Sequence, residues 1–354
     1  MRRTHRPAGP AAGSRETVLG RILPGTELVA ASTSRGIELL QVVDDFVSNQ
    51  SQFDRQARVH LRRDVLEVTR EVYLDYVGSQ VMDWPDNELE LLRQIVESIA
   101  ARFARLDLTL PDRIFLVKTN GSEEGYAAYT RQMNVIVLPE NMVSSLETST
   151  GFGDPLHPTS GTTYLQDVLI HELFHIFSKN NPGRRYELYR LLHFYPTGNA
   201  VDLPGVKWPE NATTMMPDMK ITNPDTPALD VYIEMNVPSG GGSDHAKTPL
   251  LPVLLSNAAY SGGIFFTYLQ WWFMAIERTG GRWVARSDGK GRPLLYSSQS
   301  LLTQYLDLVG RNFGNELFHP DEILAQSFVL VANQPSLGVL SAVNQMLAKH
   351  QPSA

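Results

Sequence analysis

The sequence of 354 residues contains no cysteine. This absence excludes disulfides, cysteine nucleophiles and metal sites with cysteine ligands. Any metal site in the chain must therefore take its ligands from histidine, aspartate and glutamate. Histidine itself is scarce, with nine residues in the whole chain.

Two further features are missing: a basic tract and a long apolar run. The net charge is −7 and no long block of Lys and Arg occurs, which argues against nucleic acid as the main partner. The longest apolar run, GIFFTYLQWWFMAI at 263–276, is too short to span a bilayer and indicates no membrane partner. The first residues have no continuous apolar segment of a secretory signal. We therefore expect a cytoplasmic protein, with export left open, and its oligomeric state stays undetermined.

The composition and the hydrophobic patterns predict an α+β fold that is predominantly helical, with one small mixed or antiparallel sheet. A buried strand is expected at 113–119 and a β-hairpin at 125–139. Helices are predicted at 86–106, 162–178, 186–194, 262–281, 297–309 and 320–333. The first of these is amphipathic, and the one at 262–281 is apolar on all sides.

The changes in composition along the chain divide it into five regions. They are a disordered or extended N-terminal segment (1–35), a helical region (36–110), a sheet with a central helix (111–195), a lobe rich in Pro and Gly (196–258) and a C-terminal helical region (259–350).

The segment DVLIHELFHIFSK at 167–179 contains His171, Glu172 and His175 in an otherwise apolar helix. Residues four apart in a helix lie about 40° apart around its axis and about 6 Å along it, so both imidazoles can reach one ion. Glu172 lies beside them and can accept a proton from a water molecule. Burying two imidazoles and a carboxylate without partners is costly, which favours a metal site over a chance occurrence. This H-E-x-x-H spacing is typical of zinc metallopeptidases.

With a strand and hairpin before it, the HELFH motif resembles the zincin metallopeptidases. Ser178 and Asn181 stand where the metzincin branch has Gly and His, which leaves the gluzincin branch. This resemblance implies a zincin-like core, one zinc ion per chain, hydrolysis of a peptide or small amide substrate, and a glutamate on a later helix as the third ligand. It covers roughly 110–180 and 315–335.

Glu322 is the preferred candidate for that third ligand, because it lies in the first turn of an apolar helix that begins at Pro320. Gln326 occupies the place where gluzincins often have an aspartate that binds a metal-bound histidine. Glu187 is the next candidate, followed by Glu234 and Asp244.

Zincins also commonly use a tyrosine or histidine to stabilise the oxyanion of the reaction. Tyr260, just before Gly262 and Gly263, and His245, in the segment GGGSDHAK, are the candidates for this role.

Two functions follow from these patterns. The first is a zinc-dependent hydrolase, most simply a metallopeptidase with Glu172 as general base. The second is a degenerate zincin-like metal protein that modifies or binds a small molecule, which the Gln at 326 and the long gap between His175 and Glu322 keep open.

Overall fold

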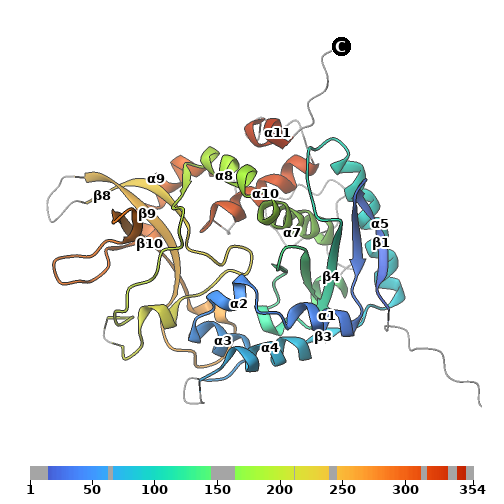
Figure 1. Ribbon diagram of the computed structural model, residues 1–354, viewed down its shortest axis with the longest axis horizontal. Coiled ribbons are helices and arrows are strands. Elements are labelled where there is room, and N and C mark those ends of the chain that lie inside the picture. The colour runs from blue at the N-terminus through green and yellow to red at the C-terminus, as the bar shows by residue number, and fades with distance from the viewer. Residues whose placement is uncertain are drawn as a thin grey trace, which may run out of the picture.

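The computed structural model describes residues 15–62, 67–144, 164–210, 212–238, 245–311, 317–333 and 341–347. These residues form an α+β fold with two six-stranded sheets, at opposite ends of the view in Figure 1. The predicted fold class is therefore confirmed in its broad form, but there are two sheets rather than one small one.

The first sheet is mixed and contains the predicted strand and hairpin. Its strand order is β1-β2-β4-β6-β5, with parallel pairing in the centre and antiparallel pairing at both edges, and β3 pairs with β4. The strands are β1 (Thr17–Leu23), β2 (Thr26–Ala30), β3 (Val81–Met82), β4 (Arg113–Thr119), β5 (Tyr129–Arg131) and β6 (Val135–Pro139).

Alternate side chains of the buried strands point to opposite faces of this sheet, so both faces are apolar. Helices cover both of them. Ile114 and Leu116 of β4 pack with α5 and α7, whereas Phe115 and Val117 pack with α1 and α4. The helices of the first half are α1 (Thr33–Leu40), α2 (Asp45–Asn49), α3 (Gln52–Arg58), α4 (Arg70–Ser79), α5 (Asp86–Phe103) and α6 (Glu140–Ser144). A 3₁₀ helix, η1 (Ser122–Glu124), precedes β5.

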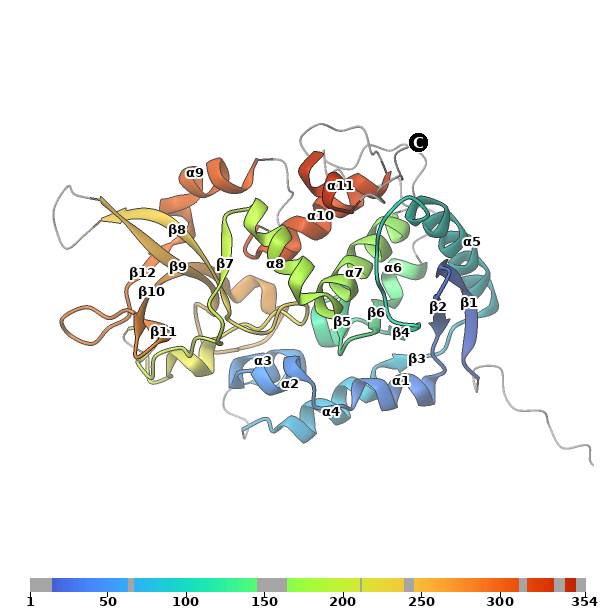
Figure 2. The same cartoon turned by 45° about the horizontal axis from the view of Figure 1, so that its top comes forward.

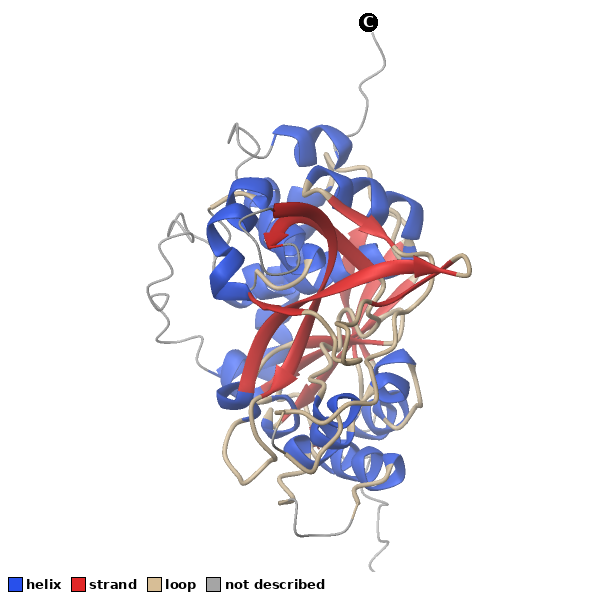
Figure 3. Cartoon of the chain, turned by 90° about the vertical axis from the view of Figure 1, so that its left-hand side faces the viewer, coloured by secondary structure: helices blue, strands red, loops and turns tan. Residues whose placement is uncertain are grey.

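The second sheet is antiparallel and was not predicted: its strands lie partly in the region expected to be a lobe rich in Pro and Gly (196–258) and partly in the region expected to be helical (259–350). Its order is β11-β10-β9-β8-β7, and β12 pairs with β10. The strands are β7 (Phe194–Pro196), β8 (Val231–Pro238), β9 (His245–Ser256), β10 (Leu269–Thr279), β11 (Arg282–Ala285) and β12 (Leu295–Ser297), with the 3₁₀ helices η3 (Met216–Met219) and η4 (Phe265–Tyr268) in the same region. The strands of both sheets are drawn in red in Figure 3.

The predicted helix at 262–281 is wrong, because this run forms η4 and β10. The strand is covered on both faces: Phe273 and Ala275 belong to one apolar cluster, and Met274 and Ile276 to another. A strand buried on both faces loses its polar alternation, so its periodicity does not distinguish it from a buried helix. The C-terminal region therefore begins with strands, and its helices start only at Ser298.

The helix with the HELFH motif, α7 (Tyr164–Asn180), lies between the two sheets, and α10 (Pro320–Asn333) packs along it (Figures 1 and 2). Phe328 of α10 contacts Phe174 of α7 with the ring centroids 5.5 Å apart, and Phe103 of α5 at 5.4 Å. The remaining helices are α8 (Pro182–Leu191), α9 (Ser298–Val309) and α11 (Ser341–Leu347).

At the N-terminal end, within the segment predicted to be disordered or extended, residues 17–30 form the paired strands β1 and β2. Residues 1–14 lie outside the described residues. Among the helices of the described ranges, none combines the length and the apolar character needed to cross a bilayer.

A buried ion network joins α3 to the segment before β5 and to a loop of the second half. The Arg58 guanidinium donates two hydrogen bonds of 2.6 Å to Glu124 and one of 2.7 Å to Asp54. It also donates to the carbonyl of Thr222, whose amide and hydroxyl donate to Asp54. Burial lowers the pKa of this guanidinium, but the two acids outweigh burial and raise it.

We expect Arg58→Ala to lower the free energy of unfolding by about 3–5 kcal/mol, because two buried carboxylates would lose their counter-ion. Arg93→Ala is the control: Arg93 forms an exposed ion pair with Glu90, and its loss should cost less than about 1 kcal/mol. Urea unfolding of both variants measures the difference, and equal stability losses would contradict a structural role for the network.

Candidate metal centre

The two motif histidines reach the same point from consecutive turns of α7. His175 is fully buried and His171 has 12% of its side chain exposed. Their Nε2 atoms lie 3.0 Å apart. Two neutral imidazoles can share such a contact only if one of these nitrogens carries a proton, whereas a shared cation lets both face it unprotonated.

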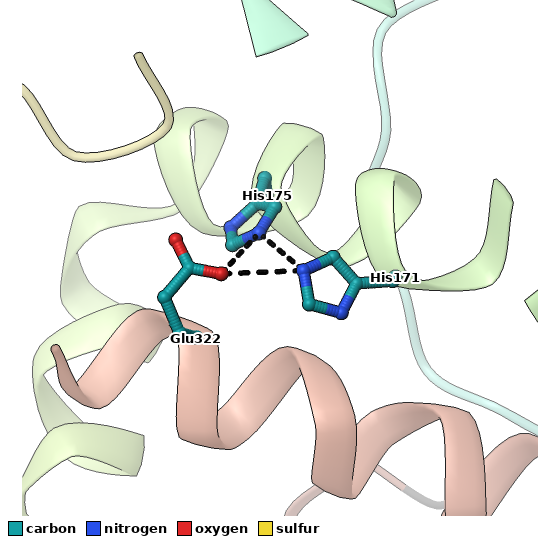
Figure 4. Close-up of side chains that lie close together, drawn as sticks. All are labelled: His171, His175 and Glu322. Atoms are coloured by element: carbon teal, nitrogen blue, oxygen red, sulfur yellow. Dashed lines mark hydrogen bonds and ion pairs between the residues drawn. The ribbon is translucent and has the colours of Figure 1, made fainter. Parts of the chain in front are cut away.

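Glu322, in the first turn of α10, completes the group (Figure 4). Its Oε2 lies 3.2 Å from Nε2 of His171 and 3.3 Å from Nε2 of His175. Burial would raise the pKa of this carboxyl, but the charge and hydrogen bonds of the histidines hold it well below its usual value. Burial alone would lower the pKa of His175, yet Glu322 and the neighbouring acids raise it well above its usual value.

The three atoms mark a triangle with sides of 3.0, 3.2 and 3.3 Å. Ligands that bind a tetrahedral ion at about 2.0–2.1 Å lie about 3.3–3.4 Å from one another. His171, His175 and Glu322 can therefore hold a metal ion with little rearrangement, and Glu322 takes the place predicted for the third ligand.

Asp321, next to Glu322, fixes the orientation of His175. Its Oδ2 lies 2.7 Å from Nδ1 of His175, and its Oδ1 accepts hydrogen bonds from the hydroxyls of Ser178 and Tyr189. A proton held on Nδ1 leaves Nε2 as the ligand atom. The sequence had placed this function at Gln326, one turn further along α10. Asp321 performs it instead because the first turn of α10, and not its second, faces His175.

Asn223, in the loop between η3 and β8, fixes the orientation of Glu322 in a similar way. Its side-chain amide donates a 2.6 Å hydrogen bond to Oε1 of Glu322, which leaves Oε2 directed at the histidines. Its carbonyl oxygen accepts a hydrogen bond from the backbone amide of Asp225. One side chain thus positions both a ligand and the next acid of the site.

Glu172 is buried beside the ligands, and its Oε2 has no hydrogen-bond partner among the described residues. Burial, followed by the negative charge of Asp225, raises the pKa of Glu172 to about 8. A buried carboxylate oxygen without a partner is costly, and such atoms occur where a ligand or a reacting group binds. Glu172 is therefore placed to exchange a proton with a molecule bound at the metal centre.

Asp225 completes a ring of acids around the two histidines. Carboxylate and imidazole atoms of Glu172, His175 and Asp225 all lie within 4.8 Å of one another. One oxygen of Asp225 accepts hydrogen bonds from the amide and hydroxyl of Thr130 in β5, and that hydroxyl also accepts one from the ammonium of Lys179.

Acids gather at this point. Four of them, Glu172, Asp225, Asp321 and Glu322, lie close to the histidines, and among the described residues Lys179 and Arg185 interact electrostatically with some of these acids. An excess of buried negative charge is unfavourable unless a cation compensates it. The electrostatics and the triangle of ligand atoms therefore both indicate a bound metal cation.

A cavity of about 120 Å³ opens beside the metal centre, lined by His171, Glu172, Asp225 and Glu322 on one side. The rest of its lining comes from both halves of the chain, from Arg58, Glu124, Ala127, Ala128, Ile221, Thr222, Asn223, Pro224, Leu254, Phe265, Phe266, Leu269 and Phe318. Glu172 therefore lines a space that a small group of a substrate can enter.

The two residues predicted to stabilise an oxyanion do not line this cavity. The Tyr260 hydroxyl donates to the carbonyl of Gly263 and lies 3.3 Å from Nδ1 of His60, so it holds its own loop together. His245 is exposed at the start of β9, where it pairs with Pro238. His245 is the first residue of β9, and Tyr260 lies in the segment between β9 and η4.

The alternative third ligands are also placed elsewhere. Glu187 is exposed on α8, and Glu234 of β8 forms an ion pair with Lys247. Asp244 lies outside the described residues. Asp321, Asn223 and Asp225 were missed from the sequence. The acidic pair at 321–322 was a usable signal for Asp321, but Asn223 and Asp225 lie in a loop whose sequence does not indicate its distant partners.

Comparison with models of known protein families, with curated proteins and with solved structures finds no match for this chain.

We expect His171→Ala, His175→Ala and Glu322→Ala each to remove most of the metal bound after incubation with Zn²⁺, because two ligands alone hold an ion weakly. Glu187→Ala is the matched control and should keep one equivalent. Elemental analysis of the purified variants measures this. Full metal content in all three ligand variants, or a selective loss in the Glu187 variant, would refute the assignment.

Asp321→Asn should weaken metal affinity by about 10–100-fold, because a neutral amide holds the proton on Nδ1 of His175 less strongly than a carboxylate does. Asp307→Asn, in an exposed position on α9, is the control with the same chemical change. Competition with a chelator of known affinity gives both constants. If the two variants bind the metal equally well, Asp321 does not orient the ligand.

Proposed function

We propose that the protein is a zinc-dependent hydrolase that cleaves a peptide or small amide bond, with Glu172 as general base. The main support is that two metal-ligand side chains, His171 and Glu322, line the same cavity as Glu172. The unpaired oxygen of Glu172 supplies the acceptor that amide hydrolysis requires.

Zinc is the ion that suits this ligand set best. Two imidazoles and one carboxylate, with room for a fourth ligand, are typical of catalytic zinc sites. Harder ions such as Mg²⁺ and Ca²⁺ prefer shells of oxygen ligands. Zinc in such a site acts as a Lewis acid and lowers the pKa of coordinated water to about 7.

Glu172, Asp321 and Asn223 have separate roles in the proposed reaction. Glu172 accepts a proton from the water that adds to the amide carbonyl carbon, and returns it to the nitrogen when the C–N bond breaks. Asp321 and Asn223 hold His175 and Glu322 in position, so the site does not need to reorganise during the reaction. The apolar walls of the cavity exclude bulk water from this proton exchange.

A metal protein that acts on a small molecule without peptidase activity is the second candidate. The limited volume of the cavity favours it, since about 120 Å³ holds one side chain or a small compound. The Gln at 326 had been a reason for this alternative, but Asp321 supplies the missing carboxylate. The hydrolase is favoured because the site contains a proton acceptor, Glu172, and two residues that orient the metal ligands, Asp321 and Asn223.

We expect Glu172→Gln to keep its metal and to lose at least about 100-fold in kcat, because the amide has nearly the same size but cannot accept a proton. Glu187→Gln is the control and should keep both metal and rate. The measurement is hydrolysis of a mixed library of short peptides and acylated amines by zinc-loaded protein, followed by mass spectrometry.

The two candidates give different results in that experiment. Cleavage of peptides by the wild type but not by the Glu172 variant supports the peptidase. Cleavage restricted to the acylated amines supports a hydrolase of small amides, and cleavage of neither class by the zinc-loaded protein supports the second candidate. An unchanged rate in the Glu172 variant would contradict its role as base.

A further inference from the structure

The lining of the cavity beside the metal centre has two chemically different parts, called here its polar end and its apolar end. His171, Glu172 and Glu322 form a polar end. The other end is formed by aromatic and aliphatic side chains from β9, η4, β10 and the segment before α10, namely Leu254, Phe265, Phe266, Leu269 and Phe318. The apolar end is therefore continuous with the reacting centre.

We propose that this apolar end is a specificity subsite, which binds an uncharged, medium-sized apolar group attached next to the bond that is cleaved. Below, the five residues that form it are called the apolar subsite. The proposal rests on the hydrolase function proposed above and adds the chemical class of the substrate.

The charged groups that face the apolar subsite compensate each other. Arg58 and Glu124 line the cavity, but they bind one another through two hydrogen bonds of 2.6 Å. The guanidinium also lies over the ring of Phe265, 4.7 Å from its centroid. A charged substrate group would have to leave water without gaining a free partner, which is unfavourable. An apolar group has no such cost and gains from burial.

The loop that forms one wall of the apolar subsite is held in place by close packing. The ring of Phe266 approaches Gly125 so closely that a Cβ atom on this glycine would lie 2.8 Å from it, and Gly125 has a φ of +61°. Phe265 and Phe266 also pack together with centroids 4.2 Å apart. The wall is thus formed before a substrate arrives, which lowers the entropic cost of binding.

Part of the apolar lining is also exposed. Phe266 has 44% of its surface exposed, and Ile264, which lies against the same Gly125, has 45%. Exposed apolar side chains that adjoin the lining of a cavity are typical of a binding surface rather than of scattered surface residues. They give the neighbouring part of a substrate an apolar surface to contact.

The experiment separates the apolar subsite from the metal site by using small zinc-binding probes. The probes are acetohydroxamate, 3-methylbutanehydroxamate and a hydroxamate of similar length that ends in a carboxylate. Their binding to zinc-loaded protein is measured by calorimetry. We expect 3-methylbutanehydroxamate to bind at least about tenfold more tightly than acetohydroxamate, because its added carbons enter the apolar subsite. The carboxylate probe should gain nothing.

Two leucines of β9 provide matched variants. Leu254 packs with Phe265 and lines the cavity, whereas its neighbour Leu255 is buried in the apolar cluster on the opposite face of the strand. Leu254→Ala should reduce the affinity ratio of the two uncharged probes several-fold, and Leu255→Ala should leave it unchanged. Phe318→Leu, at a partly exposed position of the same wall, gives a second test that does not depend on the stability of β9.

The outcomes distinguish this inference from the function on which it rests. Equal binding of the two uncharged probes by the wild type, or equal ratios in the Leu254 and Leu255 variants with no change in the Phe318 variant, would overturn the apolar subsite and leave the metal site intact. Failure of acetohydroxamate to bind the zinc-loaded protein would instead contradict the metal centre itself, and the inference with it.

Discussion

The contact between α7 and α10 is the constraint on which the site depends. Phe174 and Phe328 bring the two helices together inside the largest apolar cluster of the described residues. The contact sets the first turn of α10 against the second half of α7, so that Glu322 and Asp321 meet the histidines. Apolar packing, which is not directional, thus determines the geometry of ligands whose positions must agree within a few tenths of an ångström.

The segment at 221–225 connects the parts of the molecule around the cavity. Thr222 binds Asp54 of α3, Asn223 binds Glu322 of α10, and Asp225 binds Thr130 of β5. These three hydrogen-bonded contacts lie within four residues of one loop. Through these contacts the loop holds the wall of the cavity in a fixed position relative to the metal ligands. A loop positioned by a rigid framework is a common location for functional residues.

Charge is distributed differently at the metal centre and near Arg58. Glu172, Asp225, Asp321 and Glu322 gather close to the histidines, which favours a bound metal ion, whereas Asp54 and Glu124 are compensated by Arg58. The same cavity therefore combines a polar end that attracts a cation with an apolar end that has no free charge. Such a combination suits a substrate with one polar reacting group and an adjoining apolar group.

The sequence by itself determined the local features of this protein. His171 and His175 share a helix face because they are four residues apart, Glu322 was found because a buried first-turn acid needs a partner, and β4 was found from its short apolar run. Only the tertiary structure decided that Asp321 and not Gln326 binds His175, that 269–279 is a strand, and that Tyr260 and His245 do not line the cavity. Local periodicity depends on bonds between near neighbours, whereas these contacts join residues far apart in sequence, and only the packing of whole elements brings such residues together.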